Sequence, residues 1–143
     1  MMMNEIELLK EINKNCQTGI EGLEYTMDKV KDSNLKHVLM GEIDSYNNIY
    51  DRTKELLNQK GYEIQTVPIT QKVSSWMGIQ LNTLSNQSNS KIAEILIQGN
   101  DMGIVKGVKN INHMKFKDSG IKNILQDFVS LQQKNIEELK KFL

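Results

Sequence analysis

Apolar side chains recur at intervals of three and four residues along most of the chain, which is the period of an amphipathic α-helix. The breaks in this pattern, "DSN" at 32–34 and "DSG" at 118–120, carry residues that favour helix N-caps. We therefore expect two helical hairpins with short turns. Their helices are predicted at about residues 4–31, 34–60, 90–115 and 120–142.

The segment between the hairpins, residues 61–89, departs from the helical pattern. It contains the only proline, Pro68, and leads into the polar run "NQSNS". An amphipathic stretch inside it predicts a short helix that begins near Thr70. The apolar positions of that stretch are Val73, Trp76, Met77, Leu81 and Leu84.

A connector of this length can travel the whole length of a bundle, so that the second hairpin starts at the opposite end. An up-down-up-down bundle would need only a short loop there. We therefore expect one all-α domain over residues 1–143, a ferritin-like four-helix bundle with hairpins at about 4–60 and 90–142 and a long crossover at 61–89. A weak internal repeat agrees with this duplication, since "LKHVL" in the first hairpin matches "IKNIL" in the second.

Three glycines, Gly99, Gly103 and Gly107, follow one another at four-residue spacing in the third predicted helix. A phosphate-binding loop would need a preceding strand, and the pattern here is helical. Each glycine inside a helix costs about 1 kcal/mol relative to alanine. We expect them to form a shallow groove for another helix or an aromatic ring, with Trp76 or Met77 as candidates; the alternative is that glycine is simply tolerated.

The balance of charged residues narrows the classes of partner that the chain is expected to bind. The chain has 18 basic and 18 acidic residues, so no affinity for nucleic acid or a membrane surface is expected. No apolar run approaches the length of a membrane span, and the N-terminus lacks the pattern of a signal peptide. The single cysteine, Cys16, cannot form an internal disulfide, and a cytoplasmic protein is expected.

Ferritin-like bundles commonly hold two metal ions with a Glu from each of two helices and a Glu-x-x-His from each of the others. Here Glu42 lies on an apolar stripe, but Ser45 stands where the pattern requires His. The corresponding pair in the last helix is Gln132 and Asn135, which are amides. An iron or manganese centre using Glu42 and Asp101 is therefore the alternative, and no cofactor is the main expectation.

The core-facing polar positions form a separate group. For Glu42 we expect a buried carboxyl with a raised pKa, hydrogen-bonded to Tyr46, Tyr50, Gln132 or Asn135. Two other interpretations are a remnant metal ligand and an exposed side chain. The candidates for a polar core or ligand pocket are Glu42, Tyr46, Asn100, Gln132 and Asn135.

The remaining residues with chemical potential have simpler interpretations. Cys16 is expected to be a small core residue. His37 and His113 are expected at opposite ends of the bundle, at the surface or capping a helix, too far apart to share an ion.

The stretch "SSWMGIQLNTLSNQSNSKIAEILIQGNDMGI", together with "KNIEELKKFL", resembles a small group of uncharacterised ferritin-like proteins from spore-forming bacteria. The resemblance covers most of residues 70–143. It implies the fold, a cytoplasmic location and a sporulation or stress setting, and it implies no catalytic residues.

The sequence favours a non-catalytic structural or binding module. A homodimer or another protein partner is expected through the helix predicted at 90–115 or through the Trp76 segment. The alternatives are a metal-binding oxidoreductase of the di-iron or di-manganese type and a helical bundle that binds a small molecule in its polar core.

Overall fold

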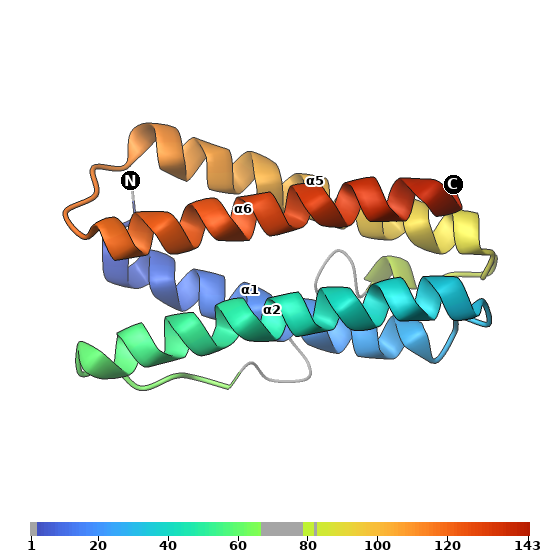
Figure 1. Cartoon of the computed structure of the whole chain (residues 1–143), viewed down its shortest axis with the longest axis horizontal. Coiled ribbons are helices and arrows are strands. Elements are labelled where there is room, and N and C mark those ends of the chain that lie inside the picture. Colours follow the sequence, from blue (N-terminus) through green and yellow to red (C-terminus); the bar gives the residue numbers. More distant parts are fainter. Residues whose placement is uncertain (1–2, 67–78, 82) are drawn as a thin grey trace.

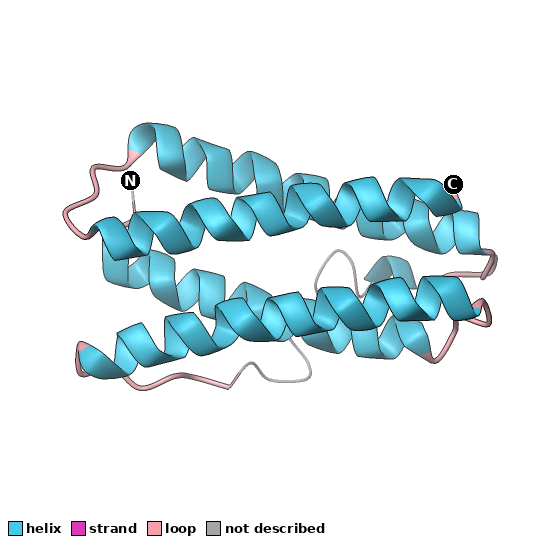
Figure 2. Cartoon of the chain, viewed as in Figure 1, coloured by secondary structure: helices cyan, strands magenta, loops and turns pink. Residues whose placement is uncertain are grey.

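A computed structural model describes residues 3–66, 79–81 and 83–143 of the chain. These residues are largely helical, and Figure 2 shows helices joined by loops, with no strand in the part that is described. The prediction of an all-α structure is confirmed. The labelled elements are α1 (Glu5–Met27), α2 (Ser33–Gln59), α5 (Asn89–His113), α6 (Ser119–Leu139) and the short 3₁₀ helix η1 (Lys140–Phe142).

Each long helix begins at a polar side chain that accepts a hydrogen bond from the first turn. Asn4 forms a reciprocal capping box with Glu7 at the start of α1. Asp32 and Asp118 cap α2 and α6, so both helices begin one residue earlier than predicted. Ser88 caps α5 in the same way. The capping residues at the predicted breaks therefore act as the sequence indicates.

The helix ends differ more from the predicted ones. Helix α1 ends at Met27 instead of near residue 31, because the backbone N–H groups of Lys29 and Val30 bond to the carbonyls of Thr26 and Met27, only three residues back. This tighter turn places Val30 in the core, where it is 3 % exposed. Helix α2 ends as predicted near Gly61, whose φ of 86° is the left-handed conformation that glycine favours at a helix C-terminus.

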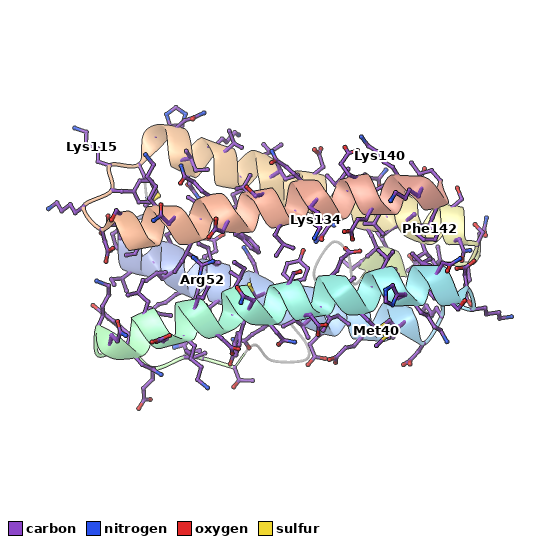
Figure 3. All side chains as sticks on the ribbon, in the orientation of Figure 1. Met40, Arg52, Lys115, Lys134, Lys140 and Phe142 are labelled. Carbon is purple, nitrogen blue, oxygen red and sulfur yellow. The ribbon has the colours of Figure 1, made fainter. Side chains whose placement is uncertain are left out.

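The helices form two antiparallel hairpins, α1 with α2 and α5 with α6 (Figure 1). Helices α2 and α5 run in the same direction, so the chain passes from one end of the molecule to the other between them. This is the crossover that the long connector predicts. Between the hairpins, α2 packs against α6, and Arg52 of α2 pairs with Asp127 of α6 at 2.8 Å (Figure 3).

The connector is described only in part. Residues 79–81 are helical, and Leu81 is fully buried. The short helix predicted to begin near Thr70, together with Trp76 and Met77, lies outside the described residues.

The apolar stripes of the four long helices meet in one core. Burying a leucine or isoleucine side chain contributes roughly 1.5–3 kcal/mol, so this cluster is the main stabilising element of the fold. The largest fully buried side chains are Leu8, Leu9, Ile12, Leu35, Leu39, Leu57, Leu81, Ile92, Leu96, Ile121, Leu125 and Leu139.

The second half of α5 leaves apolar side chains uncovered. Met102, Val105 and Val108 are 53 %, 49 % and 37 % exposed. The helix packs on α6 through the side that carries Asn100 and Gly107, which are buried. Its outer side faces away from that contact, so these apolar side chains remain at the surface.

Candidate functional site

Five polar side chains from three helices lie in the interior of the molecule. Each is at most 6 % exposed. Glu42 and Tyr46 of α2 are four residues apart, and Gln132 and Asn135 of α6 are three residues apart. Each pair therefore lies on one face of its helix. We call this group the polar core; it consists of Glu42 and Tyr46 of α2, Asn100 of α5, and Gln132 and Asn135 of α6.

Asn100 is the centre of the hydrogen bonds in the polar core. Its Oδ1 accepts from the Tyr46 hydroxyl at 3.2 Å and from Nδ2 of Asn135 at 3.3 Å. Its own Nδ2 donates to the backbone carbonyl of Leu96 at 2.8 Å, which fixes the orientation of the amide. One side chain of α5 therefore links α2 to α6 within the interior.

The Tyr46 ring is held between helices by two residues that sequence reasoning did not single out. Phe128 of α6 makes an edge-to-face contact with it, with ring centroids 6.2 Å apart and planes at 63°. Gly19 of α1 leaves room on the other side, since a Cβ there would lie 3.3 Å from Tyr46 Cζ. A glycine within an apolar helical pattern was the only available signal for this contact.

Three buried oxygens in the polar core have no hydrogen-bond partner within the described structure. They are both carboxyl oxygens of Glu42 and Oε1 of Gln132. The expected hydrogen bond from Glu42 to Tyr46, Tyr50, Gln132 or Asn135 is therefore absent. The Tyr46 hydroxyl and one N–H of the Asn135 amide donate to Asn100 instead.

Burial controls the protonation of the polar core. Burial, with a smaller contribution from the Glu138 carboxylate, raises the pKa of Glu42 to about 8. Burial also raises the pKa of Tyr46; the Glu42 carboxyl and Cys16 add to this, and the amides of Asn135 and Gln132 oppose it. The pKa of the buried Cys16 thiol rises to about 12. All three groups are therefore protonated at neutral pH.

Two of the three glycines of α5 lie directly against α6. A Cβ on Gly103 would lie 2.2 Å from Nε2 of Gln132, and one on Gly107 would lie 2.4 Å from Cγ2 of Val129. Gly103 thus provides the space that the Gln132 amide occupies in the polar core. Gly99 is partly buried on the same helix. A contact of these glycines with Trp76 falls outside the described residues.

The two candidate metal ligands differ in their surroundings. Glu42 is buried, whereas Asp101 is exposed on α5. In the described ranges, no group of three or more His, Cys, Asp and Glu residues is placed to hold a metal ion. His37 and His113, at the start of α2 and the end of α5, are both exposed. The polar core itself offers one carboxyl group among amides and a phenol.

A second buried polar contact lies beside the polar core and was not predicted. Nδ2 of Asn13 in α1 donates to Oγ1 of Thr53 in α2 at 3.1 Å, and both residues are buried. Nε2 of Gln17 donates to Oδ1 of Asn13 at 2.8 Å and to the carbonyl of Gln65 at 3.0 Å. These bonds fasten the segment that follows α2 to α1. Single Asn and Thr residues at core-facing positions were the only sequence signal.

Comparisons with protein-family models, with curated proteins and with solved structures give no match. The class of protein is therefore defined by the structure itself: within the residues that it describes, four long helices form two hairpins and enclose a polar core. Of the helices described, none is both long enough and apolar enough to cross a membrane.

Proposed function

We propose that this chain is a non-catalytic, ferritin-like binding module of the cytoplasm that lacks a di-metal centre and uses its polar core to bind a small molecule. The crossover between two antiparallel hairpins supports the ferritin-like assignment, since this connectivity is typical of that fold. The observation that carries the binding role is the set of three buried oxygens without partners.

Unpaired buried oxygens are unfavourable for folding. Each costs about 1–3 kcal/mol when it loses its water without gaining a donor. Apolar side chains at positions 42 and 132 would remove this cost. The chain retains acceptors there, in a protein whose other buried side-chain oxygens in the described ranges are hydrogen-bonded. A ligand that supplies the missing donors accounts for both facts.

The donor set favours binding over catalysis. A di-metal site uses several carboxylates and imidazoles, and the polar core has one carboxyl group. A nucleophile needs a deprotonated group or an adjacent base. Here burial keeps the thiol of Cys16 and the phenol of Tyr46 protonated. The groups that remain are hydrogen-bonding amides and a neutral carboxylic acid.

Native mass spectrometry of the purified chain tests this function. We expect a small molecule bound to the wild type and lost in Glu42→Gln, because the substitution replaces one acceptor oxygen by an amide. Asp44→Asn, an exposed change of the same kind on the same helix, should retain the ligand. Plasma mass spectrometry after incubation with Fe(II) or Mn(II) tests the alternative function, a metal-binding oxidoreductase. That alternative predicts about two bound ions per chain, which are lost in Glu42→Ala.

The exposed apolar side chains of α5 favour a second role, a homodimer or a complex with another protein. Met102, Val105 and Val108 lie within two turns of one another and are at least one-third exposed. Sedimentation at tens of micromolar should then show a dimer that dissociates in Val105→Lys, since burying a lysine charge in an apolar interface is unfavourable. A strict monomer in the wild type would exclude the homodimer.

A further inference from the structure

When Glu42 is ionised, the unpaired groups of the polar core are all hydrogen-bond acceptors. The three atoms are Oε1 and Oε2 of Glu42 and Oε1 of Gln132, and no buried side-chain nitrogen in the described ranges lacks a partner. Glu42 is 2 % exposed and Gln132 is 6 % exposed, so bulk water does not satisfy them. A ligand that fits must therefore supply several donors and no acceptor. An –NH₃⁺ group has three donors and no acceptor.

The unpaired groups come from α2 and α6, two helices that pack against each other. Glu42 precedes Tyr46 by one helical turn, and both the Glu42 carboxyl and the Gln132 amide act on the Tyr46 hydroxyl. The missing Cβ of Gly103 fixes where the Gln132 amide lies. The acceptors therefore belong to the same group of side chains as the Tyr46 hydroxyl.

The charge of the site determines whether a cation or an anion fits it. An ionised Glu42 would be a buried negative charge, and one positive charge beside it makes a neutral pair. The titratable or charged groups around it are Tyr46 on its own helix, Cys16 on α1, and Glu138 on α6. The Lys134 ammonium lies 3.8 Å from Glu138 and is largely exposed. Helix α5 contributes the neutral amide of Asn100. These surroundings favour a monovalent cation over an anion.

We propose that the polar core binds a primary ammonium group, either the ammonium ion or the amine end of a small molecule, through both oxygens of Glu42 and Oε1 of Gln132. The proposal rests on the binding function proposed above and names the chemical class of its ligand. A divalent ion fits less well, because it takes about six oxygen ligands and is usually balanced by more than one carboxylate.

Binding exchanges one cation for one proton. The free protein holds Glu42 as a carboxylic acid at neutral pH, and the bound form holds it as a carboxylate beside the ammonium group. The proton leaves to solvent, and no covalent bond other than this O–H bond changes. The apparent affinity should therefore rise about tenfold per pH unit as the pH approaches the pKa of Glu42 from below.

Thermal unfolding at about pH 8 in matched chloride salts tests the proposal. Ammonium and methylammonium should raise the midpoint temperature in a concentration-dependent way, whereas tetramethylammonium, which has no N–H group, should not. Butylammonium distinguishes the source of the group: a larger effect than that of ammonium assigns the site to the amine end of a small molecule, and no effect assigns it to the ion itself.

Variants connect the effect to the site. Glu42→Gln should weaken ammonium binding about 10- to 100-fold, as expected for the loss of a charge-assisted hydrogen bond. Gln132→Met should weaken it as well, and it keeps the test possible if the first variant does not fold. Asp44→Asn should behave as the wild type, since Asp44 is exposed on the same helix.

Two results would overturn the ammonium site. One is an equal shift with tetramethylammonium. The other is a shift that persists unchanged in both Glu42→Gln and Gln132→Met. A different ligand detected by native mass spectrometry and lost in Glu42→Gln would also overturn it while leaving the binding function intact. The binding function itself would be overturned if neither native mass spectrometry nor thermal unfolding detected a ligand whose binding changes in Glu42→Gln.

Discussion

Glu42 is a carboxyl group whose two oxygens are buried without a hydrogen bond, beside a tyrosine and two amides. Its neutral form is the stable one in the folded protein, because burial disfavours the carboxylate. Asn100 takes the donors that could otherwise have reached it. The chemistry of the interior therefore depends on how three side chains, Tyr46, Asn100 and Asn135, divide their hydrogen bonds.

This arrangement predicts how stability depends on pH. The pKa of Glu42 rises from its ordinary value of 4.5 to about 8 on folding, so the folded chain keeps a proton that the unfolded chain releases. The contribution of Glu42 to stability should be greatest below about pH 4.5, fall as the pH rises and level off above about pH 8. The total loss is on the order of 4–5 kcal/mol.

In Glu42→Gln this pH dependence should be absent, and the variant should exceed the wild type in stability at about pH 8. Urea unfolding at several pH values, in buffers free of amines, measures the effect. Asp44→Asn serves as the control for loss of an acid on α2. Parallel pH profiles for wild type and Glu42→Gln would show that the carboxyl is not buried in its neutral form.

At the scale of the elements, the close approach of α5 and α6 depends on missing side chains. Gly103 and Gly107 lie one turn apart and face Gln132 and Val129. The spacing of the glycines predicted a groove, and the structure identifies α6 as the helix that lies in it. The polar core thus exists because α5 allows an amide of α6 to lie directly against its backbone.

Replacing a packed glycine of α5 by alanine should lower the stability of the protein, whereas replacing an exposed glycine of α2 should raise it. Gly103→Ala should destabilise the protein by roughly 1–3 kcal/mol, because its Cβ would displace the Gln132 side chain. Gly41→Ala should stabilise it by up to about 1 kcal/mol, since Gly41 is exposed within α2 and a Cβ there meets nothing within 4 Å. Thermal unfolding of both variants measures the difference, and equal effects would contradict this packing.

At the scale of the whole molecule, the crossover between the hairpins determines which helices meet. Helices α2 and α5 run in the same direction. In this arrangement Tyr46 of α2 and Asn135 of α6 both reach Asn100 of α5. A bundle with a short second connection would reverse the second hairpin and bring different residues to the centre. The outer side of α5 is left with exposed Met102, Val105 and Val108, which is where a partner would bind.

The sequence by itself determined the local structure. Three- and four-residue periodicity indicated the four long helices, and Asp32, Asp118 and Gly61 marked their ends, because helix formation and capping depend on neighbouring residues. It also selected the five polar positions, since four of them lie on an apolar stripe and Asn100 lies between two apolar faces of its helix. The length of the connector was enough to predict the crossover, because a shorter loop would have sufficed for the alternative.

Only the tertiary structure decided how these positions interact. Sequence reasoning assigned Glu42 a hydrogen bond, but the donors reach Asn100, because distances between side chains on different helices depend on packing angle and register. The same reason explains why Gly19 and Phe128 around Tyr46, and the exposure of half of α5, were not foreseen. Periodicity shows which side of a helix is apolar, and the arrangement of neighbouring helices decides which part of that side is buried.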